Sequence, residues 1–264
     1  MAQKKVWITW LPQGEGAPEP DAAVSVLSQV GLDAAGSHWV DDLEKVAWAE
    51  LGGLLLDPGK ADIWLVAGRE SDFGAKRNRY GLSLVAAMIA DGRDATLQGI
   101  CVGLDFQPDA DTLPTFMHQF LCLSGSGPSW PAKVVAAAFG KPGVPPRPEF
   151  RFNVIAHPML GQWFEVGPRD SQWQGIMFGV DGEASITHHA VGPRGQLPEK
   201  SVLEYPTQGI KAALGDTEFT AWSVQNVLGP DESYYLKVDG FPNDVILGAE
   251  PTSDEAEVIH LELT

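Results

Sequence analysis

The sequence predicts an α/β domain followed by a strand-rich domain. Up to about residue 140, short apolar runs alternate with stretches whose apolar residues recur at helical spacing. From residue 150 onward, nearly every apolar run is short and bounded by turn residues. Between them, residues 141–149 are rich in proline and glycine and cannot continue a helix. We therefore expect domains at residues 1–140 and 150–264, joined by this linker.

The first half is predicted to alternate between strands and helices. Apolar, β-prone runs place strands at residues 6–10, 37–40, 63–67 and 97–104. Apolar spacing and capping signals place helices at about residues 20–31, 41–57, 80–90 and 111–120, with a last helix from Pro131. Strands that alternate with helices of this length need crossover connections, so the sheet should be mainly parallel. The expected fold is a three-layer α/β sandwich, flavodoxin-like or Rossmann-like.

The second half is predicted to be a β-sandwich or barrel. Turn pairs such as Asp181-Gly182 and Asp239-Gly240 separate its apolar runs. Strands are expected at residues 150–155, 162–166, 176–180, 185–191, 219–227, 234–238, 245–247 and 258–263. Only the segment from Thr207 to Leu214 is expected to be a helix. Such strands bury their apolar faces most readily by pairing into two sheets or a closed barrel.

Cysteine content and the length of the apolar runs indicate in which cellular compartment the protein is expected. The two cysteines, Cys101 and Cys122, lie in or beside apolar runs, which is typical of small buried side chains in a reducing compartment. No apolar run approaches the length of a signal-peptide core or a membrane span. We therefore expect a cytoplasmic protein that makes no membrane contact.

The net charge limits the classes of molecule that the protein is expected to bind. The formal net charge is −17, and the residues from 150 onward include 17 acidic and only 6 basic side chains. Such a surface repels phosphate backbones, so general nucleic-acid binding is not expected. Any site for an anion has to be a local one.

The best candidate for such a site is the segment from Gly68 to Tyr80. It directly follows the clearest buried strand and contains four basic and two acidic residues in an otherwise acidic chain. Ligands of open parallel sheets bind beyond the carboxyl ends of the strands. A nucleotide phosphate or similar anion would therefore be held by the basic and hydroxyl side chains of this segment, Arg69, Ser71, Lys76, Arg77 and Arg79. The alternative interpretation is a solvated loop whose cations pair with surplus carboxylates.

Other motifs indicate neither a cofactor nor a metal. Gly14-Glu15-Gly16 follows the first strand but lacks the third glycine of a dinucleotide-binding loop. The segment from Ser124 to Ser129 does not match the GxSxG nucleophile turn. His188 and His189 are adjacent on a predicted strand and point to opposite faces, so they do not readily share one ion.

Residues 4 to about 120 resemble a Toll/interleukin-1 receptor (TIR) domain or a flavodoxin-like relative of one. The resemblance lies in the opening strand Lys5-Val-Trp-Ile-Thr-Trp10, the helix from Val24 that ends at Gly31, and the third strand from Ala61 to Ala67 with the nearby Ser71. NAD-cleaving TIR domains carry a glutamate on the helix after that strand, whereas Gly81 to Ala90 contains no acidic residue here. The resemblance thus implies a form without hydrolysis that binds a nucleotide or a protein.

Three functions remain open from the sequence. The leading hypothesis is a non-catalytic binding or assembly protein, whose α/β half recognises a nucleotide-like anion or a protein partner and whose β-rich half makes protein contacts. The second is a nucleotide- or NAD-processing hydrolase that uses Glu70, Ser71 or Asp105 at the strand ends. The third is a structural subunit of a larger complex, docked through an uncharged face near Trp163 and Trp173.

Overall fold

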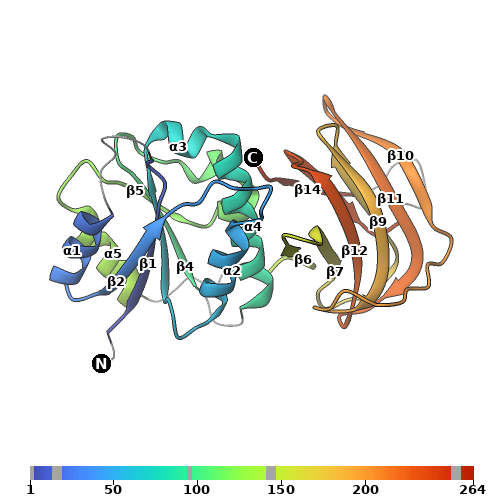
Figure 1. Cartoon of the computed structure of the whole chain (residues 1–264), viewed down its shortest axis with the longest axis horizontal. Coiled ribbons are helices and arrows are strands. Elements are labelled where there is room, and N and C mark those ends of the chain that lie inside the picture. The colour runs from blue at the N-terminus through green and yellow to red at the C-terminus, as the bar shows by residue number, and fades with distance from the viewer. Residues whose placement is uncertain (1–2, 14–19, 94–96, 141–146, 251–256) are drawn as a thin grey trace. The chain divides into compact units, whose positions relative to one another are not determined.

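The chain forms two compact units. The structure, a computed structural model, describes residues 3–13, 20–93, 97–140, 147–250 and 257–264. Its contacts group residues 1–43 with 47–145, and residues 44–46 with 146–264. The first unit contains helices around a parallel sheet, and the second contains two antiparallel sheets (Figure 1). Most of the predicted linker, residues 141–146, lies outside the described residues.

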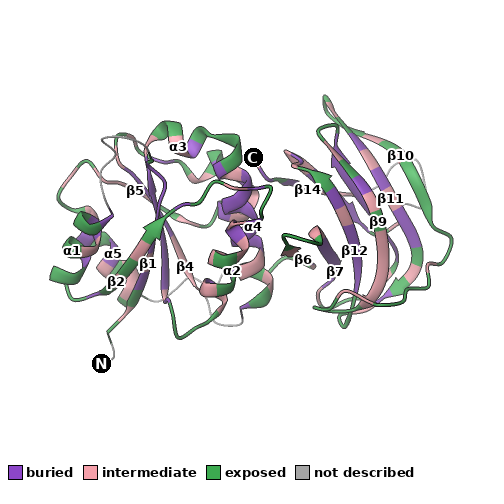
Figure 2. Ribbon diagram, in the orientation of Figure 1, coloured by how far each residue is buried: buried purple, intermediate pink, exposed green. Residues whose placement is uncertain are grey.

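The first unit is built on a five-stranded parallel sheet with the order β2-β1-β3-β4-β5. Its strands are β1 (Lys5–Trp10), β2 (Asp33–His38), β3 (Ile63–Gly68), β4 (Gln98–Gly103) and β5 (Leu121–Ser124). The central strand β3 is buried at every position, as expected for a parallel strand covered on both faces. Figure 2 shows this burial in the middle of the sheet. The strand order is compatible with a flavodoxin-like fold.

Helices connect these strands and cover the sheet. They are α1 (Asp21–Gln29), α2 (Trp48–Leu56), α3 (Glu70–Gly74), α4 (Lys76–Gly92) and α5 (Trp130–Phe139), with short 3₁₀ turns η1 (Ala110–Thr112) and η2 (Thr115–Met117). Ala23 and Leu27 of α1 and Val134 of α5 share one apolar core with the strands. Helices α1 and α5 therefore pack on the same face of the sheet. No helix within the described ranges is long and apolar enough to cross a membrane.

The structure corrects the end of the first half. The helix expected at residues 111–120 is replaced by η1 and η2, because Pro114 interrupts the segment and Asp109 accepts a hydrogen bond from the N–H of Asp111. The following strand β5 is absent from the sequence prediction. It has only four residues, lies at the edge of the sheet, and has one buried side chain, Leu123.

The second unit consists of two antiparallel sheets. One has the order β6-β7-β12-β9 and the other the order β10-β11-β8-β13-β14. The strands are β6 (Phe150–His157), β7 (Gly161–Pro168), β8 (Trp173–Asp181), β9 (Ala184–Pro193), β10 (Thr207–Leu214), β11 (Thr217–Leu228), β12 (Glu232–Gly240), β13 (Asp244–Gly248) and β14 (Ile259–Glu262). The sheets pack through aromatic rings: Phe164 of one sheet lies 5.5 Å from Phe178 of the other, with Phe152 beside both.

The helix expected from Thr207 to Leu214 is wrong, because this segment is the edge strand β10. It pairs with β11, and the pairing is irregular between Thr207 and Ile210. Gly209 lies there at φ +74°, a conformation that glycine adopts without steric cost. This irregularity and the exposure of most of the strand hide the alternation by which a strand is recognised.

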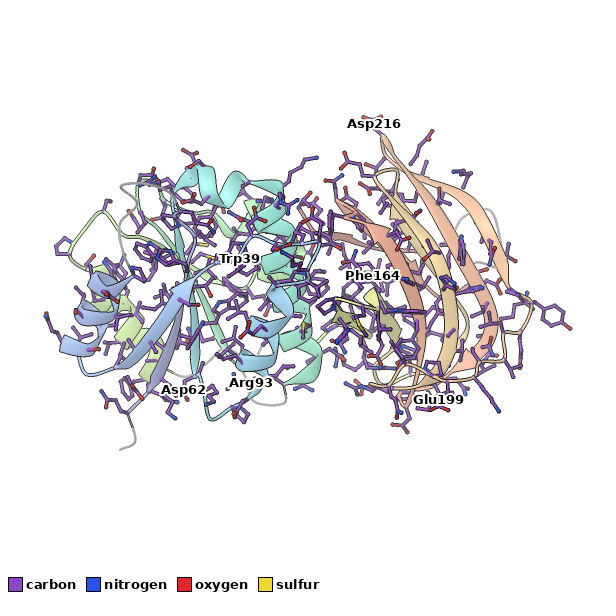
Figure 3. The ribbon with its side chains drawn as sticks, in the orientation of Figure 1. Trp39, Asp62, Arg93, Phe164, Glu199 and Asp216 are labelled. Atoms are coloured by element: carbon purple, nitrogen blue, oxygen red, sulfur yellow. The ribbon has the colours of Figure 1, made fainter. Side chains whose placement is uncertain are left out.

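Charged groups at the amino edge of the parallel sheet have structural roles (Figure 3). Arg93 donates hydrogen bonds to the carbonyl groups of Leu55 (2.9 Å) and Ala61 (2.7 Å). Burial alone would raise the pKa of Asp62, but hydrogen bonds from the Lys5 N–H and the Lys4 ammonium lower it overall. These bonds fasten the chain where β1 and β3 begin.

Candidate functional site

The connections that follow the neighbouring strands β1 and β3 lead to opposite sides of the parallel sheet. The chain leaves β1 through α1 and returns as β2 on one side, whereas it leaves β3 through α3 and α4 and returns as β4 on the other. In open α/β sheets, ligands bind where successive connections depart in opposite directions. The fold therefore directs attention to the ends of β1 and β3.

An apolar cavity of about 230 Å³ lies at this place. Each of the neighbouring strands ends in or near its wall, with Trp10 from β1, Ala67 from β3, and Leu104 just after β4. The remaining lining residues come from α1, the sheet, the turn after β5 and the start of α5, namely Ala22, Ala23, Val26, Leu65, Val102, Gly125 and Trp130. The cavity thus combines the carboxyl edge of the sheet with two helices and two indole rings.

The residues that line the cavity differ in exposure. Trp10 at its base is 5% exposed, whereas Val26 at its rim is 36% exposed. Gly125 allows the turn after β5 to approach strand β4 closely, because a Cβ at this position would lie 3.0 Å from the Val102 side chain and 3.1 Å from the Gly103 carbonyl oxygen.

The basic segment found in the sequence is mostly helical. The sequence predicts a loop until about Tyr80, but α4 already begins at Lys76. Its first turn gives no apolar spacing, since Lys76 and Arg77 are exposed and the buried side chain there is the polar Asn78. The basic residues therefore occupy the start of a helix.

These predicted site residues have different surroundings. Arg77 Nε lies 3.1 Å from Asp41 Oδ1, and Arg79 Nη1 donates to the Thr112 carbonyl at 2.8 Å. Of these two contacts, the one between Arg77 and Asp41 is of the kind that the alternative interpretation expected, a cation paired with a carboxylate. Ser71 is exposed on α3, and Lys76 is exposed on the first turn of α4.

Arg69 is the predicted residue that is placed best for a ligand at the cavity. It follows β3 at the N-cap of α3, two residues after Ala67, and its backbone is extended at φ −83° and ψ 167°. Side chains two apart in an extended segment point to the same side, so Arg69 leaves the sheet on the side of Ala67. The carbonyl of Gly68, between them, accepts a 2.8 Å hydrogen bond from the N–H of Leu104 at the cavity wall.

The residues considered for catalysis form hydrogen bonds with other groups of the same unit. Asp105 Oδ1 accepts a hydrogen bond of 2.9 Å from the N–H of Glu70, which is the first residue of α3. The Asp105 carboxylate thus satisfies a donor that the helix leaves unpaired. Ser124 Oγ lies 2.7 Å from Ser126 Oγ in the turn after β5. Gly14-Glu15-Gly16 lies outside the described residues.

The adjacent histidines lie in separate environments, as strand geometry predicts. His189 is half-buried, with its Nδ1 2.8 Å from the Tyr234 hydroxyl and its ring 4.8 Å from that of Trp222. Burial lowers the pKa of His189. His188 is exposed, and its ring lies 6.4 Å from that of Trp163. Over the described ranges, no group of three or more His, Cys, Asp and Glu side chains is arranged to hold a metal ion.

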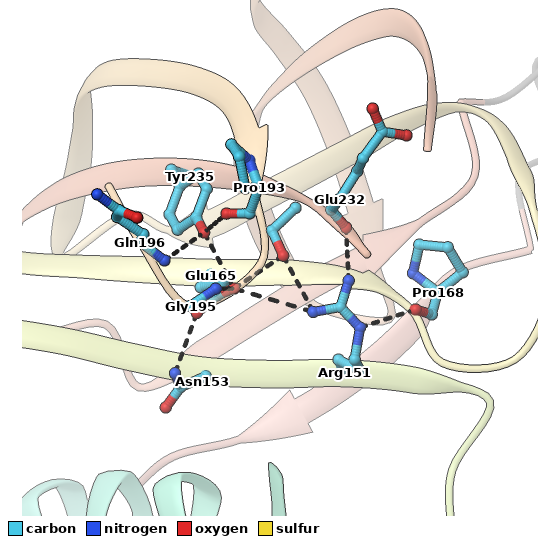
Figure 4. A network of polar contacts seen from close by, with 10 residues as sticks. Arg151, Asn153, Glu165, Pro168, Pro193, Gly195, Gln196, Glu232 and Tyr235 are labelled. Atoms are coloured by element: carbon cyan, nitrogen blue, oxygen red, sulfur yellow. Dashed lines mark hydrogen bonds and ion pairs between the residues drawn. The ribbon is translucent and has the colours of Figure 1, made fainter. Parts of the chain in front are cut away.

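A buried polar network in the second unit was not foreseen from the sequence (Figure 4). Arg151 on β6 and Glu165 on β7 are each 1% exposed, with 3.9 Å between Arg151 Nη1 and Glu165 Oε1. Glu165 Oε1 accepts hydrogen bonds from the Gly195 N–H (2.7 Å), the Ser233 hydroxyl (2.8 Å) and the Tyr235 hydroxyl (3.1 Å). The sequence signal was two charges fourteen positions apart, which becomes informative only when strands β6 and β7 are known to pair.

The rest of this network is equally well bonded. Arg151 Nε donates to the Pro168 carbonyl at 2.9 Å, and Arg151 Nη1 donates to the Ser233 hydroxyl at 3.0 Å. Burial, followed by the negative charge of Glu165, raises the pKa of Tyr235 to about 12. Buried charges with this many partners usually hold a fold in one arrangement. We therefore assign the network a structural role.

No family model matches this chain, and no curated protein matches it significantly in sequence. The resemblance to TIR domains therefore rests on the quoted residues alone.

Proposed function

We propose that this chain is a non-catalytic binding protein, whose α/β unit holds a nucleotide-like molecule at the carboxyl edge of its sheet. The observation behind this proposal is the apolar cavity at the ends of β1 and β3, where the connections after these two strands lead to opposite sides of the sheet. The proposal treats the unit as a three-layer, flavodoxin-like sandwich related to TIR domains. It also gives the β-rich unit a role in protein contacts and places the protein in the cytoplasm, where unbridged thiols such as its two cysteines are usual.

The cavity favours a ligand with a flat apolar part. An engineered apolar cavity of about 150 Å³ binds benzene, so the 230 Å³ space accommodates a planar ring system. Trp10 and Trp130 provide aromatic surfaces for it. Ring contacts of this kind recognise a nucleobase without requiring a charged group inside the cavity.

The edge of the sheet favours an anionic part on the same ligand. Arg69 follows the cavity residue Ala67 on the same side of the strand. Its guanidinium would hold a phosphate group through charge-assisted hydrogen bonds. Because Asp105 is occupied in capping α3, a binding role is favoured over one in which this carboxylate transfers protons.

Isothermal titration with AMP and adenosine tests the proposal. Val26→Trp places a large side chain at the rim of the cavity, and the matched control Val30→Trp changes a similarly exposed residue beyond the end of α1. We expect Val26→Trp to weaken both ligands by about tenfold or more, an effect of about 1.4 kcal/mol. The control should bind like the unchanged protein.

A second pair of variants distinguishes the contribution of the ring to binding from that of the phosphate group. Arg69→Gln should weaken AMP by about tenfold, because a hydrogen bond to a charged group contributes about 1.5–3 kcal/mol. It should leave adenosine unaffected, and Lys133→Gln on the exposed surface of α5 should change neither affinity. Absence of binding by both ligands would reject the nucleotide class. Binding that is insensitive to Val26→Trp would reject the cavity.

A further inference from the structure

The two cysteines of the chain face each other across neighbouring strands. Cys101 on β4 is directly opposite Cys122 on β5 in the parallel register. Opposite residues of a parallel pair have their side chains on the same face, and neighbouring strands are about 4.8 Å apart. This spacing lies within the range of about 4.4–6.8 Å between Cα atoms that a disulfide spans. The backbone therefore already has the separation that a bond between the two sulfur atoms requires.

The surroundings of the pair make the two thiols unequal. Cys101 is fully buried, between two glycines of β4 whose Cβ positions are filled by phenylalanine rings, Phe120 over Gly99 and Phe106 over Gly103. Cys122 lies on the edge strand β5 and is partly exposed. Reagents in solution therefore reach Cys122 first, and Cys101 lies opposite it on the neighbouring strand.

The acidities of the thiols follow the same order. Burial raises the pKa of Cys101, which keeps this thiol protonated. The hydrogen bond from the Cys101 thiol lowers the pKa of Cys122, because it stabilises the thiolate at that sulfur. The exposed sulfur is thus the more nucleophilic one.

We propose that Cys101 and Cys122 form a reversible disulfide between β4 and β5 when the protein meets a hydroperoxide. The inference rests on the pairing of these strands and on the burial of their side chains, independently of the cavity and its ligand. It makes Cys122 the residue that is oxidised first and Cys101 the residue that resolves it.

The chemistry balances with one hydroperoxide. The Cys122 thiolate attacks the terminal oxygen of the peroxide, the O–O bond breaks, and Cys122 becomes a sulfenic acid while hydroxide or alkoxide leaves. The Cys101 sulfur then attacks the Cys122 sulfur, the S–O bond breaks, and the departing hydroxide takes the Cys101 proton to form water. The proton that Cys122 lost neutralises the first leaving group. Two thiols are oxidised, one peroxide is reduced, and a dithiol reductant reverses the bond.

Hydrogen peroxide treatment of the whole chain tests this inference. We expect the intact mass to fall by two hydrogen atoms, both thiols to disappear from a count made after unfolding, and dithiothreitol to restore them. Peptide mapping should find Cys101 joined to Cys122. These measurements use the unaltered protein, so they do not depend on whether a variant folds.

Two variants assign the roles. In Cys122→Ser, the remaining Cys101 thiol should react with peroxide at least about tenfold more slowly than the thiols of the unaltered protein, because a buried protonated thiol is a poor nucleophile. In Cys101→Ser, Cys122 should stop at the sulfenic acid and be trapped by dimedone. Intact thiols in treated unaltered protein would overturn the proposal. So would oxygen addition to Cys122 without a bond to Cys101, or a disulfide between two chains.

Discussion

The two units of this protein contrast in how their interiors are filled. The α/β unit leaves an apolar hollow of about 230 Å³ beside the carboxyl ends of its central strands. The β-rich unit builds an ion pair, Arg151 and Glu165, into one of its sheets and gives it hydrogen-bond partners on several strands. Empty apolar volume destabilises a fold, and a buried charge does so unless it is bonded. The difference teaches that the second unit surrounds its costly groups with internal hydrogen bonds, whereas the first unit leaves apolar side chains around an unfilled space.

The largest effect should come from breaking the ion pair of the β-rich unit. Glu165→Ala leaves the Arg151 guanidinium buried without its carboxylate and removes the acceptor of four hydrogen bonds. We expect the free energy of unfolding to fall by about 3–5 kcal/mol. Urea unfolding followed by circular dichroism measures this loss.

The matched control for this variant is Glu199→Ala, which removes an exposed carboxylate of the same unit (Figure 3). Its effect should stay within about 0.5 kcal/mol. If Glu165→Ala unfolded at the same urea concentration as the control, the network would not hold the unit together. A role for Glu165 outside stability would then have to be sought.

The next largest effect on the free energy of unfolding should come from Gly167, which lies against the Arg151 guanidinium. Gly167 lies opposite Arg151 in the register, and a Cβ there would be 2.8 Å from Arg151 Nη2 and 3.0 Å from the Glu232 carbonyl oxygen. Gly167→Ala should therefore displace the arginine and cost about 1–3 kcal/mol. Gly182→Ala, in a turn where a Cβ meets nothing within 4 Å, is the control. Equal stability of the two variants would show that Arg151 moves aside freely.

Much of the architecture of the first unit was predictable, and the departures have local causes. The strand predicted at residues 63–67 is confirmed as β3, since a continuous apolar run is a strong signal for a buried parallel strand. The edge strands β5 and β10 were missed because exposed strands carry weak apolar patterns. The start of α4 at Lys76 was missed because a polar first turn is indistinguishable from a loop by periodicity.

The candidate site was harder to predict than the fold. The sequence pointed to the carboxyl edge of the sheet, and Arg69 lies at that edge, while its binding of a ligand stays a prediction. The cavity itself is formed by small, branched aliphatic and aromatic residues from six segments, such as Trp10, Ala67 and Trp130, which look like ordinary core residues in the sequence. Their common wall becomes visible only once the strand order is known. The ligand role predicted for Arg77 and Arg79 stays a prediction, and their internal partners, Asp41 for Arg77 and the Thr112 carbonyl for Arg79, could not be read from charge alone.

A smaller effect tests whether Asp105 serves the fold of the α/β unit. Asp105→Ala removes the acceptor for the Glu70 N–H at the start of α3. We expect a loss of about 0.5–2 kcal/mol in the free energy of unfolding, as for other helix caps. Asp105→Asn keeps an acceptor and should lose less. If both variants retained full stability, the carboxylate would be available for another task, and the hydrolase alternative would gain ground.

The smallest effect is a dependence of stability on pH that belongs to the β-rich unit. Burial lowers the pKa of His189 from its ordinary 6.5, with Tyr234, Trp222 and Gln208 around its ring. Between the lowered folded value and the unfolded value, the unfolded chain binds more protons than the folded one. The contribution of His189 to stability is therefore fully present above about pH 6.5 and is lost as the pH falls through the folded pKa.

Melting temperatures measured across this pH range test the assignment. His189→Gln, which keeps a hydrogen-bonding group beside Tyr234, should flatten the decline on the acid side, while His188→Gln on the exposed face of the same strand should leave it unchanged. A decline of equal slope in both variants would assign the pH dependence to other groups. A flattened curve in His189→Gln alone would show that burial and hydrogen bonding keep the His189 imidazole neutral in the folded β-rich unit. Such an internally bonded side chain contrasts with the lining of the cavity in the α/β unit.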